Sequence, residues 1–218
     1  MQPWRAHQHV FTRLAPVIDA TCSFYQFTAN DAVPMLVGLP PVVDERTRIV
    51  ILGSFPGEAS LAAKQYYAHP RNQFWRLMSA VIGEPLADTD YDGRLARLLA
   101  HQIGLWDTVA ACKREGSLDA AIRQAQANEL SVLERHCPHL VRVCFNGKTS
   151  GKSEQRFRTA GFDTLVLPSS SPANAQMSFD DKLTIWKKIV DPKRSITLLE
   201  EVVSAIDTIH VQIPNPGA

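Results

Sequence analysis

The stretch RIVILGSFPG, residues 48–57, decides the fold class of this chain. Residues 49–52 form a continuous apolar run without polar alternation, which is typical of a strand buried on both faces of a parallel sheet. Gly53 ends the run and opens a turn shaped by Pro56 and Gly57. In open α/β sheets ligands bind outside the carboxyl ends of the strands, so this turn is a candidate binding loop.

Further apolar runs predict the other strands of the sheet, at 103–107, 140–145 and 164–167. Helical spacing of apolar residues predicts helices between the strands, one from Pro70 to Gly83 and others over 92–101, 118–135, 148–160 and 177–190. Strands that alternate with helices indicate the α/β class. We expect a three-layer α/β/α sandwich around a central, mainly parallel four-stranded sheet.

One domain is predicted over 46–190, with a segment of different character on each side. Residues 1–45 are expected to be an irregular N-terminal extension, because prolines recur there without sustained periodicity. Asp191-Pro192 interrupts the pattern, and residues 191–218 are expected to form a C-terminal helix and tail. The apolar stripe of that helix predicts packing on the core, with a partner-binding helix as the alternative.

Composition narrows the class of protein. A formal net charge of +1, with 45% hydrophobic and 21% charged residues, is typical of a globular domain rather than a disordered or fibrous chain. No apolar run reaches the roughly 20 residues of a membrane-spanning helix, and the first residues do not resemble a signal peptide. We therefore expect a cytoplasmic protein without membrane contact. The four cysteines lack CxxC spacing, so we expect reduced thiols, no metal site and no cofactor.

The segment NGKTSGKS, residues 146–153, resembles a phosphate-binding P-loop because it follows a predicted strand and opens a predicted helix. The P-loop pattern GxxxxGK[ST] requires glycine where this chain has Asn146. The last predicted strand ends in Leu167-Pro168 rather than in an aspartate that could serve Mg²⁺. Nucleotide hydrolysis is therefore disfavoured, and a P-loop-like nucleotide-binding protein is kept as an alternative of a different class.

Three segments carry the motifs that indicate chemistry: GSFPG at 53–57, QYYAHPRNQFW at 65–75 and LPSSSPANA at 167–175. The first and third follow predicted strands, and the second leads into a predicted helix. Because the carboxyl ends of parallel strands meet at one edge of a sheet, we expect the three segments to converge there.

These segments resemble the uracil-DNA glycosylase superfamily, and most closely its hypoxanthine-DNA glycosylase branch, over about residues 46–190. The sequence FNGK at 145–148 is also similar to thymine-DNA glycosylases. The resemblance implies a monofunctional DNA repair glycosylase that flips a deaminated base out of DNA and hydrolyses its N-glycosidic bond with a positioned water. It implies DNA containing deaminated bases as the partner, and we expect a monomer.

Departures from the superfamily pattern favour hypoxanthine as the base. Phe55 stands where mismatch-specific uracil glycosylases carry an asparagine that positions the water. Ser169 and Ala173 stand where uracil-specific enzymes carry a catalytic histidine and a leucine wedge. Removal of uracil or thymine from mismatches is the alternative within the class, and an inactive DNA-lesion binder is another.

The resemblance implies Asn72, the asparagine of HPRN, as the catalytic residue. An amide oxygen can orient a water, and a helix-capping role is the structural alternative. Tyr67 matches an aromatic that stacks on the flipped base, whereas Tyr66 can equally belong to the core. The base-binding candidates are Gly53, Ser54, Phe55, Tyr67, His69 and Asn146.

Asn146 and His69 each allow two interpretations. An asparagine can pair with the pairing edge of hypoxanthine, but Asn146 can equally be a left-handed residue that ends a strand. His69 can donate to the base or a phosphate, or be structural. The DNA-binding candidates are Lys148, Ser169, Ser170, Ser171, Pro172 and Ala173, and Lys152, Lys182 and Lys187 are expected to join Lys148 in facing the DNA.

Overall fold

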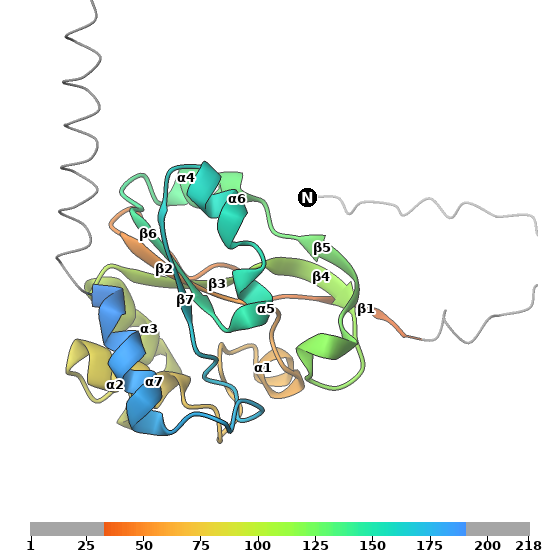
Figure 1. Cartoon of the computed structure of the whole chain (residues 1–218), viewed down its shortest axis with the longest axis horizontal. Coiled ribbons are helices and arrows are strands. Elements are labelled where there is room, and N and C mark those ends of the chain that lie inside the picture. The colour runs from red at the N-terminus through yellow and green to blue at the C-terminus, as the bar shows by residue number, and fades with distance from the viewer. Residues whose placement is uncertain (1–32, 191–218) are drawn as a thin grey trace, which may run out of the picture. The chain divides into compact units, whose positions relative to one another are not determined.

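The computed structural model describes residues 33–190, and a four-stranded parallel sheet forms its centre (Figure 1). The strand order is β3-β2-β6-β7. The strands are β2 (Ile49–Gly53), β3 (Ile103–Asp107), β6 (Arg142–Asn146) and β7 (Asp163–Leu167). All four predicted strands are confirmed. In register, Gly53 pairs with Asp107 and Asn146 with Leu167, so both pairs lie at the carboxyl edge.

Helices cover both faces of this sheet, which confirms the predicted three layers. Helices α2 (Phe74–Ile82), α3 (Tyr91–Ala100) and α7 (Phe179–Trp186) lie on one face, and α4 (Leu130–His136) and α6 (Glu154–Thr159) on the other (Figure 1). Successive side chains of β2 point into two different hydrophobic cores, one on each face of the sheet. Ile51 packs with residues of α2 and α7, whereas Val50 and Leu52 pack with residues of α4 and α6.

The shorter helical elements connect these layers. They are α1 (Glu58–Ala63), α5 (Lys148–Gly151) and the 3-10 turns η2 (Leu86–Asp88), η3 (Asp119–Ala121) and η4 (Lys187–Val190). The predicted helix over 148–160 is therefore two helices, α5 and α6. Within residues 33–190 no helix is both long and apolar enough to cross a membrane.

A second sheet, which the sequence did not predict, lies beside the first. Its strands β1 (Met35–Val37), β4 (Val109–Lys113) and β5 (Arg123–Ala127) pair antiparallel in the order β1-β4-β5. The helix predicted over 118–135 is therefore wrong before Leu130. The sequence RQAQA of β5 suits a helix by propensity, but hydrogen bonding to β4 overrides that preference.

The segments outside 46–190 are described only in part. Of the predicted irregular extension, residues 33–45 are described, and they contain β1 and a bridge between Val42 and Leu105. Residues 1–32 and the predicted C-terminal helix and tail at 191–218 lie outside the described residues.

Helix α2 begins later than predicted, at Phe74 instead of Pro70. The Asn72 N–H donates to the His69 carbonyl at 2.8 Å and so closes a turn ahead of the helix. The Gln73 N–H donates to the Ser170 carbonyl at 3.0 Å, which diverts the chain toward the later loop. The predicted end is confirmed, because Gly83 caps α2 with a left-handed φ of 77°.

Candidate active site

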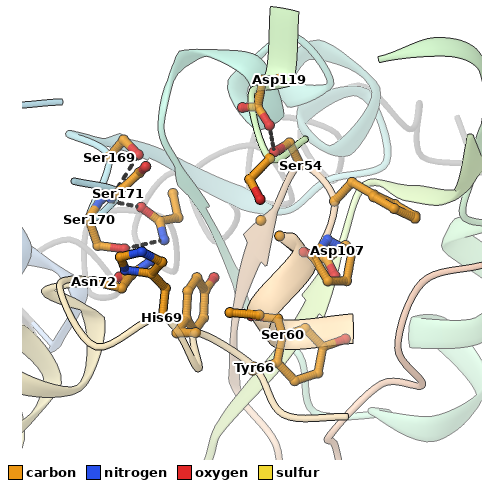
Figure 2. Close-up of a pocket in the computed structure, with 18 of the residues that line it drawn as sticks. Ser54, Ser60, Tyr66, His69, Asn72, Asp107, Asp119, Ser169, Ser170 and Ser171 are labelled. Atoms are coloured by element: carbon orange, nitrogen blue, oxygen red, sulfur yellow. Dashed lines mark hydrogen bonds between the residues drawn. The ribbon is translucent and has the colours of Figure 1, made fainter. Parts of the chain in front are cut away.

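A pocket of about 160 Å³ lies at the carboxyl edge of the parallel sheet (Figure 2). A cavity needs about 10–15 Å³ to hold one water molecule. The pocket therefore has room for on the order of ten non-hydrogen atoms, which is the size of a purine base. The predicted site residues that line it are Gly53, Ser54, Phe55, Tyr67, His69, Asn72, Asn146, Ser169, Ser170, Ser171 and Pro172. The other two, Lys148 and Ala173, are exposed and outside the lining.

The turn after β2 forms one wall of the pocket. A Cβ atom on Gly53 would lie 2.4 Å from Asp107 Oδ1, so a side chain does not fit there. Ser54 Oγ donates to Asp119 Oδ1 at 2.6 Å. Phe55 is buried, and the Arg114 guanidinium lies 4.9 Å from its ring centroid in a cation–π contact.

Asp107 and Arg114 are functional candidates that the sequence analysis missed. Asp107 is 4% exposed, lines the pocket, and its Oδ2 has no hydrogen-bond partner among the described residues. Burial, reinforced by Asp119 and opposed by Arg114, raises the pKa of Asp107 to about 8. The sequence does contain a signal for Asp107, because an acidic residue ends the predicted strand IGLWD, residues 103–107, at the carboxyl edge where ligands bind.

Arg114 is also 4% exposed, and its Nη2 donates to the Pro56 carbonyl at 2.5 Å. Its Nε and Nη1 have no partner among the described residues. Arg114 therefore stabilises the turn after β2 through its hydrogen bond to the Pro56 carbonyl and its cation–π contact with the Phe55 ring.

Tyr67 presents an aromatic ring to the pocket from a left-handed backbone, with φ of 55°. The ring stacks on Phe74 with centroids 3.7 Å apart and planes 13° apart. Its Oη is buried without a hydrogen-bond partner among the described residues, and the nearby Asn146 amide opposes the rise in its pKa. Burial, followed by the neighbouring Asp107, raises the pKa of Tyr67 above its usual value.

Tyr66 and His69 differ in how they are held. Tyr66 is buried, and its hydroxyl donates to the carbonyls of Leu39 and Pro40, which is a core role. His69 lines the pocket, and its Nδ1 accepts the Arg71 N–H at 3.1 Å.

Asn72 lies in the turn before α2, not within its first turn as predicted. Its Oδ1 accepts the Phe74 N–H at 3.0 Å and thereby starts the helix. A carbonyl oxygen has two lone pairs, so Oδ1 can accept a second hydrogen bond from the pocket side. The capping role and the water-orienting role are thus compatible.

Asn146 is tied to the serine loop, residues 169–174. Its Nδ2 donates to Ser170 Oγ and its Oδ1 accepts the Ser170 N–H, both at 2.8 Å. The left-handed interpretation is wrong, because Gly147 takes the positive φ of 105°. Both amide groups are engaged, so Asn146 holds the loop in place. The first residue of the P-loop-like segment therefore positions the serine loop through hydrogen bonds.

Lys182 is buried, contrary to the prediction that it faces DNA. It is 1% exposed, and its Nζ donates to Gln73 Oε1 at 2.9 Å and to the Asn174 carbonyl at 2.8 Å. Burial lowers the pKa of Lys182. Asn174 Nδ2 in turn donates to the Ser169 carbonyl at 3.1 Å. Lys182 therefore links the turn before α2 to the serine loop.

Lys187 is exposed but lies at the opposite edge of the sheet. It begins η4, and the carbonyls of Lys188 and Ile189 in η4 accept from Nη1 of Arg142, the first residue of β6. The amino ends of the strands lie at that edge, away from the pocket. The prediction that Lys187 faces DNA bound at the pocket is therefore wrong.

No group of histidine, cysteine and acidic side chains within residues 33–190 could hold a metal ion. Cys112, Cys137 and Cys144 are buried and form no disulfide among the described residues, and burial raises the pKa of Cys112 and Cys137. Cys22 lies outside the described residues.

Fold and site together define an α/β protein with a small pocket at the carboxyl ends of its parallel strands. The family model for the Uracil DNA glycosylase superfamily matches residues 40–190, so the chain belongs to this superfamily. The family resemblance of the three motif segments is confirmed.

Two relatives and one solved structure refine this placement. A hypoxanthine DNA glycosylase of Methanosarcina barkeri is 49% identical over 137 residues, which cover 63% of this chain and 87% of the relative. One of Methanosarcina acetivorans is 46% identical over 141 residues, covering 65% and 89%. The solution NMR structure of a Methanosarcina acetivorans protein, described as a candidate uracil DNA glycosylase, superposes with a TM-score of 0.65 at 40% identity. It covers 72% of this chain and 100% of its own.

Replacement of Lys182 tests its role as a link. Lys182→Met keeps an unbranched side chain of similar volume but leaves Gln73 Oε1 and the Asn174 carbonyl without their donor. We expect the free energy of unfolding to fall by about 1–3 kcal/mol, with faster hydrogen exchange in the serine loop. Denaturant unfolding and amide exchange measure both. Lys187→Met, at the exposed neighbour, should stay within about 0.5 kcal/mol of the wild type. Equal effects of the two variants would contradict the assignment.

The buried acid predicts a pH-dependent stability difference. The folded protein holds a proton on Asp107 up to about pH 8, whereas the unfolded chain releases it near pH 4. The folded state therefore binds more protons between these values, and the Asp107 contribution to stability falls as pH rises. Asp107→Asn removes this dependence. We expect the free energy of unfolding of Asp107→Asn, relative to that of the wild type, to increase as pH rises, by up to about 1.4 kcal/mol per pH unit. The difference should level off above about pH 8. A difference independent of pH in urea titrations would contradict this.

Proposed function

We propose that this protein is a monofunctional DNA glycosylase that releases deaminated bases, hypoxanthine first among them, and leaves an abasic site. The observation that carries the proposal is the convergence of the three motif segments on one base-sized pocket. The two relatives named hypoxanthine DNA glycosylase, at 49% and 46% identity, support the choice of base.

The pocket suits a base that has left the double helix. An enzyme that acts on a base must rotate it out of the stack and hold it by aromatic contact and edge hydrogen bonds. Tyr67 supplies the aromatic surface, and its stacking on Phe74 fixes the ring before the base arrives. Gly53 and Ser54 line the same pocket, and Ser54 Oγ, which donates to Asp119 Oδ1, can still accept a hydrogen bond from the base.

Hydrolysis needs a water on the sugar side of the base. Cleavage of an N-glycosidic bond passes through an oxocarbenium-like sugar. The C1′–N9 bond breaks with its electron pair going to the base, and the water oxygen bonds to C1′. Asn72 Oδ1, fixed by the Phe74 N–H, orients that water with its second lone pair.

The serine loop is suited to hold the DNA backbone beside the flipped nucleotide. Ser169, Ser171 and Pro172 line the pocket and are at least partly exposed, whereas Ser170, which also lines it, is fully buried. Hydroxyl and backbone N–H groups commonly bind phosphate oxygens, and such contacts position DNA without reading its sequence.

Removal of uracil or thymine from mismatches is the second candidate. The solved structure described as a candidate uracil DNA glycosylase favours it. Phe55 disfavours it, because the ring packs under Arg114 and offers no group that could hold a water.

The proposal is tested on oligonucleotides that carry inosine, uracil or xanthine, with alkali to cut abasic sites and EDTA present throughout. We expect inosine strands to be cut, and Asn72→Ala to lower the single-turnover rate by roughly 10²-fold or more because the water loses its orientation. Binding to an inosine duplex should change little. Gln155→Ala removes an exposed amide of α6 and serves as the control.

Each other outcome has a defined meaning. If only the uracil strands are cut, the protein is a uracil or thymine DNA glycosylase, which is the second candidate. Tight binding of inosine DNA without base release would indicate a lesion-binding protein. Base release by Asn72→Ala at the wild-type rate would overturn the role of Asn72 and leave His69 as the next residue to test.

Charge reversal tests the DNA-binding edge. Lys148 and Lys152 are exposed residues that follow β6 at its carboxyl end. Replacing both by Glu should weaken binding to all DNA sequences alike, and should reduce the salt slope by about 0.9 for each phosphate that is no longer neutralised. Reversing Lys187 and Lys188, at the amino edge, makes the same charge change and should leave affinity nearly unchanged. Equal reductions of affinity in the two double variants, measured by fluorescence anisotropy, would contradict a local DNA-binding edge.

A further inference from the structure

A buried carboxyl that the mechanism above does not use lines the pocket. Asp107 ends β3 and pairs in register with Gly53, the last residue of β2. Only 4% of Asp107 is exposed, and its Oδ2 has no partner among the described residues. An unsatisfied buried oxygen destabilises a folded protein, so its position at a ligand pocket requires an explanation.

A second unsatisfied oxygen adjoins the same point of the pocket wall. Tyr67 Oη is buried without a partner among the described residues. A Cβ atom on Gly53 would lie 2.4 Å from Asp107 Oδ1 and 3.4 Å from Tyr67 Oη. The missing side chain of Gly53 thus allows both oxygens to approach its backbone, and both lie on residues that line the pocket.

Burial, and after it the nearby charge of Asp119, favours retention of the proton on Asp107. Asp119, held by Ser54 at the start of the turn, opposes a second negative charge. Arg114 favours ionisation but is engaged with Pro56 and Phe55. Tyr66 and Tyr67 are the other titratable groups that face Asp107, and both have a pKa above the usual tyrosine value because they are buried.

We propose that Asp107 contacts the flipped base, its protonated carboxyl donating to the keto oxygen O6 of hypoxanthine and accepting from the adjacent N1–H. This inference rests on the proposed function and names the group that binds the base edge. A carboxylic acid has one donor and one acceptor side by side, which match this keto and N–H pair. Tyr67 Oη lies beside it as a further donor.

The contact also assists bond cleavage. When the C1′–N9 bond breaks, its electron pair becomes negative charge on the base, which spreads to O6. A donor at O6 stabilises that charge, whereas a carboxylate at the same place would repel it. Asp107 keeps its proton throughout. The attacking water supplies the hydroxyl on C1′ and the proton that neutralises the released base, so the products are an abasic site and hypoxanthine.

The test compares wild type, Asp107→Asn and Asp107→Leu in single-turnover excision from inosine DNA between about pH 6 and 9.5. Asparagine keeps a donor and an acceptor but does not titrate. We expect Asp107→Asn to remain within about tenfold of the wild type at pH 7, and the ratio of wild-type to Asp107→Asn rate to fall above pH 8. Ionisation of the substrate affects both proteins alike and cancels in this ratio. Asp107→Leu should lower the rate about 10²-fold relative to the wild type below about pH 8, and this difference should shrink at higher pH as the wild type loses its donor.

A binding measurement separates this inference from the proposed function. With a duplex that carries a non-hydrolysable 2′-fluoro deoxyinosine, Asp107→Asn should bind like the wild type and Asp107→Leu about tenfold more weakly, with equal binding to undamaged DNA. Base release by the wild type together with a constant wild-type to Asp107→Asn ratio from pH 6 to 9.5 would overturn the inference alone. If the wild type releases no base, the proposed function fails, and equal binding of the analogue by all three proteins would overturn the inference too. Where Asp107→Leu does not fold, the Asp107→Asn profile decides.

Discussion

The pairing of β2 with β3 on one side and β6 on the other is the constraint on which the site depends. Because all three strands run parallel and in register, the turn after Gly53, Asp107 and Asn146 reach the same edge of the sheet. The Gly53 backbone lies so close to Asp107 that no side chain fits between them. A shift of one residue in either pairing would turn every side chain of that strand to the opposite face and dismantle the pocket.

The site is then held by polar contacts between segments that are distant in sequence. Asn146 holds Ser170 through both groups of its amide, and Lys182 joins the turn before α2 to the serine loop. The carbonyl of Ser170 also accepts from Gln73. Residues of β6, of α7 and of the turn before α2 thus position one another through hydrogen bonds.

The parts of the structure that could be predicted from the sequence are those set by local patterns. The apolar run of β2 identifies a buried parallel strand, and parallel topology brings the loops that follow such strands together. β5 could not be predicted, because RQAQA has no apolar period and becomes a strand only through pairing with β4. Lys182 and Lys187 lie five residues apart with the same charge, and their burial depends on packing that no local pattern records. The sequence predicts Asp107 only as the end of a strand, since the burial of its carboxyl arises only in three dimensions.

The double hydrogen bond between Asn146 and Ser170 has a consequence for how the protein meets DNA. The loop is fixed when the chain folds, so its conformational entropy is lost then and not again on binding. A preformed site of this kind leaves the deformation to the nucleic acid. Entry of a base therefore depends on how readily its pair opens, and mispaired or damaged bases open at the smallest penalty. The first discrimination between lesion and normal base is then made by the mechanics of the double helix, before any side chain touches the base.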